Sequence, residues 1–228
     1  MTSSATATTV TRSGGAPPFS RALVRLCESS QKQLWALRLG RLYGFGIGFS
    51  YAVLALVGPA SLGSSTKLWA RCLVSVSWVA GIAALSLATD LAARDAAQGL
   101  TGLARLRGFG EHQLERARTL AGSLRLATTV LVPGLMVSVA SVLRFRTLPS
   151  ALLALGLAVL TLPYAALVGA ILAPLARACH YLVPGRGRLV LLVIGLGPWL
   201  VAAGTGANIP SIPGALGWLL DHLARGFH

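Results

Sequence analysis

Few residues in this sequence have the type and spacing that chemistry requires. Its three cysteines, Cys27, Cys72 and Cys179, stand far apart and form neither a CxxC pair nor a disulfide framework. A GxxxxGK[ST] phosphate loop, a GxSxG elbow and an HExxH helix are all missing from the sequence. We therefore expect no enzyme activity, no catalytic residue, no metal and no cofactor. Its four histidines also lack the intervals of a metal-binding motif: His112, His180, His222 and His228.

The segment 90–125 holds most of the acidic residues of the chain, and it is far longer than a tight turn. It reads DLAARDAAQGLTGLARLRGFGEHQLERARTLAGSLR. Apolar residues at helical spacing predict one amphipathic helix over 91–106, which Gly108 and Gly110 interrupt. We interpret this segment as a helical hairpin that docks a soluble partner; the alternative is a solvated linker. The residues expected on the docking face are Asp95, Gly99, Leu103, Leu106 and Arg107.

A second helix of the hairpin is predicted to begin at Glu111 and to run directly into a hydrophobic span. Glu111, Glu115 and Arg118 are spaced four and three residues apart. That spacing places their side chains next to one another on a helix surface, where opposite charges form pairs. We therefore expect a solvated face with ion pairs at the start of this helix.

Small residues recur at intervals of four in Gly40, Gly44, Gly48 and Ala52. This spacing puts them on one helical face, in two overlapping GxxxG patterns that let a second helix approach closely. We interpret this face as a helix-packing seam, either within a bundle or between chains. The alternative is ordinary enrichment, because the chain contains 26 glycines.

The composition indicates a membrane protein. Hydrophobic residues make up 54% of the chain and charged residues 11%, whereas soluble domains have roughly 25% charged residues. Most of the exterior must therefore face lipid. We expect an all-α, polytopic helical membrane protein with about five to six transmembrane helices, which are predicted over 43–62, 72–89, 126–143, 150–174 and 189–205. A hydrocarbon core of roughly 30 Å needs about 20 apolar residues per helix.

The segments that flank these spans differ in character. Residues 1–18 are rich in Ser, Thr, Ala, Gly and Pro, and are predicted to form a disordered cytoplasmic tail. Residues 19–42 alternate apolar and basic residues and predict an interfacial amphipathic helix, with a plain cytoplasmic helix as the alternative. Residues 43–228 would form the transmembrane domain. Within it, 206–228 is expected to re-enter the membrane or to lie on its surface, because Pro210 and Pro213 interrupt it.

The formal net charge of +14 reflects basic residues that lie between the apolar runs. They gather before the first span, between the second and third, and between the fourth and fifth. This distribution follows the positive-inside rule and predicts a cytoplasmic N-terminus in the plasma (inner) membrane. It argues against nucleic acid as a partner, which requires the basic residues to share one polar face.

Two stretches carry a resemblance to a known family. They are ARDAAQGLTGLARLRG within the hairpin and VLVPG in the following span. Together with the layout of the chain, they resemble the permease subunits of type 2 ABC exporters. The resemblance implies a coupling helix in 90–125 and a broken, partly re-entrant region over 204–223. The sequence departs from the family pattern where a sixth span should begin, and Asp95 replaces the usual glutamate of the hairpin or that residue is absent.

The function expected from this resemblance is that of the transmembrane permease subunit of an ABC-type exporter, as a homo- or hetero-oligomer. A separate cytoplasmic ATPase would power export of an unidentified, hydrophobic or lipidic substrate. The predicted spans lack the buried charges that ion-coupled carriers use, which argues against that class of transporter. The alternative is a non-transporting membrane scaffold or accessory subunit, whose basic face holds partners or anionic lipid.

Overall fold

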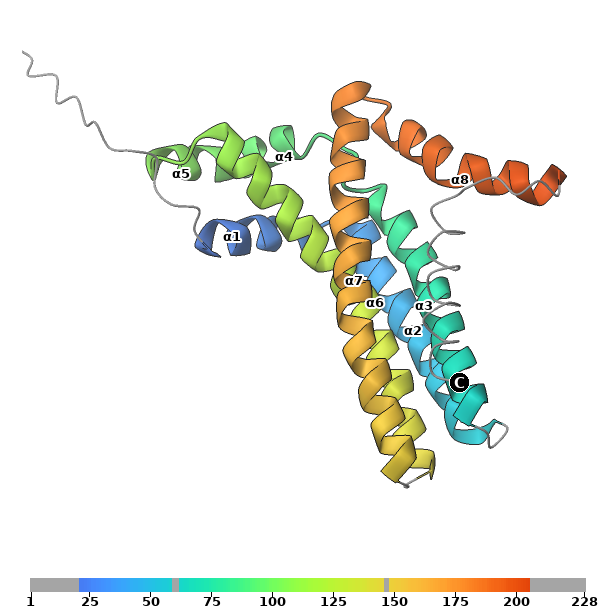
Figure 1. The fold of residues 1–228 in the computed structure, drawn as a ribbon. Helices are drawn as coiled ribbons and strands as arrows, with labels where there is room; N and C mark the ends of the chain where they lie inside the picture. The colour runs from blue at the N-terminus through green and yellow to red at the C-terminus, as the bar shows by residue number, and fades with distance from the viewer. Residues whose placement is uncertain (1–20, 59–61, 146–147, 206–228) are drawn as a thin grey trace, which may run out of the picture.

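The chain is helical throughout the part that the structure describes. The computed structural model describes residues 21–58, 62–145 and 148–205, and no strand occurs within these ranges. The prediction of an all-α fold is confirmed for them. Eight helices follow one another (Figure 1): α1 (Arg21–Gln31), α2 (Trp35–Val57), α3 (Leu62–Ala84), α4 (Leu91–Ala97), α5 (Leu100–Leu106), α6 (Glu111–Phe145), α7 (Leu148–Leu182) and α8 (Gly187–Thr205).

The four longest helices, α2, α3, α6 and α7, run side by side as a bundle (Figure 1). Each contains a stretch that is long and apolar enough to cross a membrane: Trp35–Val57, Ser65–Ala84, Glu111–Arg144 and Ala151–Leu182. At 1.5 Å per residue, even the shortest, of 20 residues, matches a hydrocarbon core of roughly 30 Å. The described residues therefore provide four candidate spans, and a total of five to six stays a prediction.

The bounds of these helices differ from the predicted spans. The first candidate span begins at Trp35 rather than at residue 43, and α3 ends at Ala84 rather than at residue 89. The predicted spans 126–143 and 150–174 lie inside α6 and α7, which continue well beyond them. Hydropathy predicts only the part of a helix that contacts lipid. The helix itself can be longer, because its backbone hydrogen bonds continue into polar sequence.

The predicted fifth span, 189–205, lies within α8. Figure 1 shows α8 projecting sideways from the end of α7 instead of running alongside the other long helices. Its first residue packs on α7 and on the segment that follows α3, because a Cβ added to Gly187 would lie 2.7 Å from the Cα of His180 and 3.1 Å from the carbonyl oxygen of Ala88. The tail 1–18 and the segment 206–228, with Pro210 and Pro213, lie outside the described residues.

The interior of the bundle is filled by Leu, Val, Ala and two buried aromatic side chains. Trp69 of α3 is fully buried and donates a hydrogen bond from Nε1 to Thr161 Oγ1 of α7 over 3.0 Å. Tyr164 of α7 shares a hydrogen bond of 2.8 Å with Ser77 of α3. Each polar atom of these aromatic residues therefore has a partner, as burial in a dry core requires.

The structure divides the predicted interfacial helix 19–42 into two pieces. The amide of Lys32 donates to Glu28 and Ser29 carbonyls, and this turn ends α1. Leu34 is extended, and α2 begins directly after it. The break allows α1 to lie across the end of the bundle (Figure 1), where Leu23 and Cys27 pack with Leu114, Ala117 and Ala121 of α6. Periodicity alone cannot reveal this break, because the apolar residues keep their helical spacing across it.

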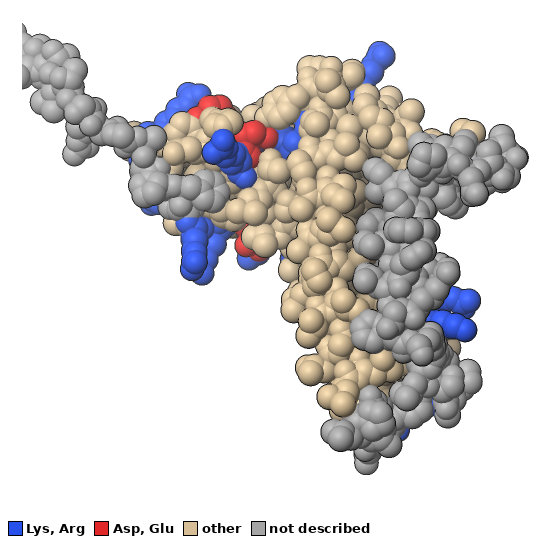
Figure 2. Space-filling model, in the orientation of Figure 1, with Lys and Arg blue, Asp and Glu red and all other residues tan. Residues whose placement is uncertain are grey.

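Charged side chains gather at one end of the bundle, which we call the basic end. It comprises α1, α4, α5, the start of α6 and the end of α7. Figure 2 shows Lys, Arg, Asp and Glu side chains around α1 and the α4–α5 segment, whereas few charges appear along the bundle. All five acidic residues among the described residues lie at this end: Glu28, Asp90, Asp95, Glu111 and Glu115.

Candidate docking site

The first part of the predicted hairpin, α4 and α5, lies where it was expected, between the second and third candidate spans; we call these two helices the α4–α5 hairpin. The side chain of Asp90 caps α4 by accepting a hydrogen bond of 2.9 Å from the amide of Ala93. Gly99, with φ of 74°, separates α4 from α5, so that the predicted helix over 91–106 forms two short helices. Gly108, with φ of 79°, follows α5. Both glycines adopt the left-handed region that other residues rarely enter.

The five residues predicted for the docking face separate into an exposed and a buried group. Leu106 is 87% exposed and Leu103 is 50% exposed. Arg107 and Gly99 are exposed as well. Asp95, in contrast, is only 4% exposed. A partner protein can therefore reach four of these residues, whereas Asp95 faces the interior of the basic end.

Asp95 forms a buried ion pair with Arg118 of α6. The distance from Arg118 Nε to Asp95 Oδ2 is 2.7 Å, and Arg118 is 2% exposed. Ser30 of α1 donates a hydrogen bond of 2.8 Å from Oγ to the other carboxylate oxygen, Oδ1. The Asp95 carboxylate thus joins α1, α4 and α6 at one point. Charge-assisted hydrogen bonds of this length are roughly twice as strong as neutral ones.

A second carboxylate extends the ion pairs to α7. Glu115 lies 3.1 Å from Arg118 Nη1 and 2.6 Å from Arg177 Nε. Arg177 also donates hydrogen bonds to the carbonyl oxygens of Leu87, over 3.3 Å, and Thr89, over 2.9 Å. Both carbonyls belong to the segment that connects α3 with α4. The set Asp95, Arg118, Glu115 and Arg177, which we call the buried network, therefore holds α4 to α6 and α7.

The structure corrects the expectation of a solvated face at the start of α6. Glu111 is exposed, and it lies 3.4 Å from Arg118 Nη1. Arg118 itself is buried, although it was expected on a surface. The signal was present in the sequence, because Arg118 follows Leu114 by four residues and precedes Ala121 by three. It thus shares the face of α6 that packs on α1.

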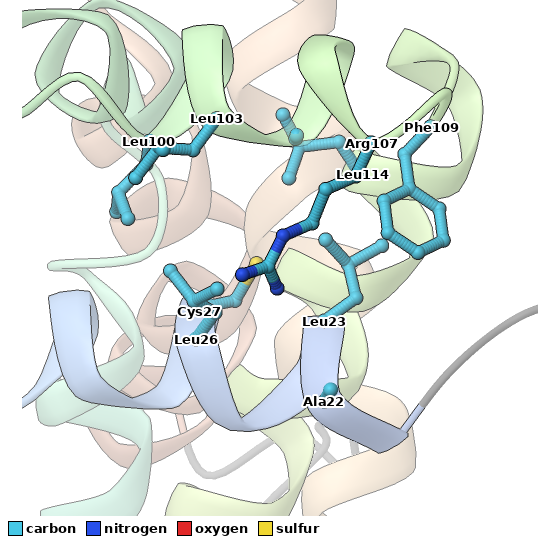
Figure 3. Close-up of a pocket in the computed structure, with 10 residues that line it drawn as sticks. Ala22, Leu23, Leu26, Cys27, Leu100, Leu103, Arg107, Phe109 and Leu114 are labelled. Atoms are coloured by element: carbon cyan, nitrogen blue, oxygen red, sulfur yellow. The ribbon is translucent and has the colours of Figure 1, made fainter.

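An apolar groove lies between α1 and α5 (Figure 3). Two predicted docking residues, Leu103 and Arg107, line it from α5. Figure 3 shows the side chain of Arg107 extending from the end of α5 toward α1. The other lining residues are apolar: Ala22, Leu23, Leu26 and Cys27 of α1, and Leu100, Ala104, Phe109 and Leu114. Arg107 therefore lies beside the apolar side chains of this groove, next in sequence to Leu106, the most exposed leucine of the hairpin.

Cys27 lines this groove, and its thiol is unreactive at neutral pH. Burial, together with the nearby charge of Asp95, raises the pKa of its thiol to about 12. The reactive thiolate is therefore almost absent at neutral pH. Cys27 serves as a small apolar side chain between α1 and α6.

Neither a family model, nor a curated protein, nor a solved structure matches the chain.

The predicted packing seam lies within the chain. Gly40, Gly44, Gly48 and Ala52 are all buried on one face of α2. A Cβ atom added to Gly48 would lie 2.6 Å from the Cα of Pro133 in α6. One added to Gly44 would lie 3.1 Å from the carbonyl oxygen of Thr129. The seam brings α2 against α6, and Gly40 brings it against Ala83 of α3.

Proposed function

We propose that the chain is a membrane subunit that couples a cytoplasmic partner protein to its transmembrane helices through the α4–α5 hairpin. The observation that carries this proposal is the buried network. A hairpin that merely joined two spans would need no buried ion pair, and such pairs contribute little net stability because their desolvation is costly. Their value lies in fixing one geometry. Here they fix the hairpin to α1, α6 and α7 together.

The exposed side of the hairpin has the chemistry of a docking surface. Leu106 and Leu103 project from α5, and large exposed leucines at a polar end of a molecule favour protein contact. Arg94 and Arg107 accompany them and form no ion pair with the carboxylates of the described residues. A suitable partner therefore offers an apolar anchor flanked by acidic side chains.

The specific form of the proposal is the permease subunit of an ABC-type exporter. It is supported by the order of elements: α1 precedes the first candidate span, and the hairpin lies between the second and the third. On this proposal the basic end is cytoplasmic, in the plasma membrane, and a separate ATPase binds the hairpin. The substrate is hydrophobic or lipidic, and its route forms between chains of an oligomer.

A second candidate function, a non-transporting scaffold, is favoured by the packing of the bundle. Gly44 and Gly48 bring α2 into backbone contact with α6, and Trp69 is fully buried between α3 and α7. Such close packing of the described helices argues against a polar path through a single chain. A scaffold would use the same hairpin to hold a partner without moving a substrate.

Purification in mild detergent, followed by mass spectrometry of co-eluting proteins, separates these functions. The exporter proposal expects a stoichiometric ATPase that is lost from Leu103→Asp/Leu106→Asp, because a charge on each anchor cannot enter an apolar contact. Leu182→Asp is the matched control, since Leu182 is an exposed leucine at the basic end outside the hairpin. Retention of the ATPase by the double variant would contradict the docking assignment. Recovery of other membrane proteins, without an ATPase, would favour the scaffold.

A further inference from the structure

A second group of basic residues lies at the corner between α1 and α2, apart from the hairpin. Arg38 Nε donates a hydrogen bond of 2.6 Å to the carbonyl oxygen of Lys32. Arg41 Nη2 donates one of 2.7 Å to Thr128 Oγ1 of α6. The Thr128 hydroxyl in turn donates to the carbonyl oxygen of Arg125, over 2.9 Å. These contacts gather Lys32, Arg38, Arg41 and Arg125 into one cluster, which we call the corner cluster.

The positive charge of the corner cluster is not balanced. The nearest carboxylate belongs to Glu28, whose Oε1 lies 3.7 Å from Arg125 Nη2. No carboxylate among the described residues forms an ion pair with Arg38 or Arg41. The positive charges of Arg38 and Arg41 repel the positive charge of Arg125. This arrangement differs from the buried network, where each arginine contacts a carboxylate, and it leaves the corner attractive to an anion.

An apolar stripe runs along α2 directly below the corner cluster. Spacings of three and four residues place its members on the helical face that begins with Arg38. All of them are exposed in the structure: Leu42, Phe45, Phe49, Val53 and Leu56. From Arg41 to Leu56 the helix rises about 22 Å, which is more than half of a hydrocarbon core of roughly 30 Å.

Two exposed aromatic residues place the corner at the level of lipid headgroups. Trp35, at the start of α2, is 73% exposed, and Tyr43 is 64% exposed. Trp and Tyr concentrate at the interface between water and hydrocarbon, where their rings are apolar and their polar atoms reach water. These two residues predict that the corner cluster lies at the level of the phosphate groups and that the apolar stripe continues into the region of acyl chains.

We propose that an anionic phospholipid of the bilayer binds at this corner, with its phosphate against Arg38 and Arg41 and its acyl chains along the stripe. Arginine suits this role because its planar guanidinium donates two parallel hydrogen bonds to phosphate oxygens. The apolar stripe favours a phospholipid over a free phosphate ion, because a phosphate ion has no apolar part that could contact the stripe. The site does not depend on the hairpin, and it applies equally to an exporter and to a scaffold.

Native mass spectrometry of the detergent-purified full chain, titrated with phosphatidylglycerol or phosphatidylcholine, tests this site. The wild-type chain is expected to bind phosphatidylglycerol more tightly than phosphatidylcholine. In Arg38→Gln/Arg41→Gln, phosphatidylglycerol should bind about thirtyfold more weakly, since each basic residue near an anionic lipid contributes roughly fivefold. Binding of phosphatidylcholine should not change.

Three control variants separate binding from folding and from net charge. Arg116→Gln/Arg186→Gln removes the same charge from two exposed residues outside both the corner cluster and the docking face, and it should retain the affinity. Arg38→Lys/Arg41→Lys keeps the charge and should retain most of the affinity for phosphatidylglycerol. The single variant Arg38→Gln changes an exposed residue, and far-UV circular dichroism should confirm that its helix content is unchanged.

Several outcomes would overturn the assignment. One is equal binding of the two lipids by the wild-type chain. Another is equal loss of affinity in Arg116→Gln/Arg186→Gln and in Arg38→Gln/Arg41→Gln, since any basic residue would then serve. The third is displacement of phosphatidylglycerol by inorganic phosphate well beyond the effect of sodium chloride at the same ionic strength. That result would identify the corner as a site for a free anion.

Discussion

The buried network and the glycine seam attach different helices to α6, and they do so by different physics. At the basic end, Asp95, Arg118 and Glu115 fix α4 to α6 through charge at distances near 3 Å. Along the bundle, Gly44 and Gly48 fix α2 to α6 through shape, with backbone in contact with backbone. The network is sensitive to the loss of one charge, whereas the seam is sensitive to the gain of one carbon atom.

The largest expected effect comes from Arg118→Ala, which leaves Asp95 buried without its partner. Breaking a buried pair in this way costs about 3–5 kcal/mol. Hydrogen exchange of the amides in 91–106 should report a fall of this size in the free energy of local opening. Arg116→Ala, which removes an exposed arginine of the same helix, is the control and should leave exchange unchanged.

Removing both charges should cost less than removing one. In Asp95→Asn/Arg118→Met no uncompensated charge remains at Asp95, so the hairpin should recover part of its protection. If Arg118→Ala and the double variant exchange at the same rate as the wild type, the network does not hold the hairpin.

Cys27 provides a second probe of the basic end. With a pKa of about 12 in place of 9.0, its thiolate fraction at pH 8 falls about a thousandfold below that of an unperturbed thiol. In a Cys72→Ala/Cys179→Ala background, labelling of Cys27 by a thiol reagent should be far slower than that of an exposed cysteine, because its thiolate is scarce and its sulfur is buried. Rapid labelling in the wild-type network would show that α1 does not stay packed on α6.

The seam is tested by Gly48→Ala, because the added Cβ meets the backbone of Pro133 at 2.6 Å. Overpacking of this kind costs about 1–3 kcal/mol, and thermal unfolding in detergent should show it as a lower midpoint. Gly46→Ala is the matched control on the same helix, since a Cβ there meets nothing within 4 Å. Equal midpoints for the two variants would mean that α2 does not pack on α6 as closely as described.

The smallest effect is expected at the start of the hairpin. Asp90→Ala removes the side-chain cap of α4 and should cost about 1 kcal/mol, seen as faster amide exchange in α4 alone. Asp90→Asn keeps an acceptor oxygen and should behave as the wild type does. A change that spreads to α6 would contradict the local role of this cap.

How far the sequence predicts the structure depends on the type of signal. The composition and the apolar runs predicted an all-α membrane protein and placed the third and fourth spans inside α6 and α7. The break at Lys32 was missed, because α1 leaves the axis of α2 in order to bury Leu23 and Cys27 against α6. That demand comes from tertiary packing, which helical periodicity does not encode.

The candidate site was predicted only in part for a related reason. Leu103 and Leu106 are exposed, as a docking face requires, whereas Asp95 is buried. A carboxylate in a basic segment looks like a surface residue until its partner is known. Arg118, which lies 23 residues further along the chain, is that partner, and sequence spacing within a helix cannot reveal a pair between two helices.

The length of α6 has a mechanical consequence. Its 35 residues form a rod of about 52 Å, so that roughly 22 Å extend beyond a hydrocarbon core of about 30 Å. If the extension lies at the basic end, it acts as a lever arm whose pivot is the membrane surface. A tilt of about 10°, well within the range that spans adopt, displaces the tip sideways by roughly 4 Å. Because Arg118 fastens the hairpin to that arm, such a tilt would carry the hairpin and the opposite end of α6 in opposite directions.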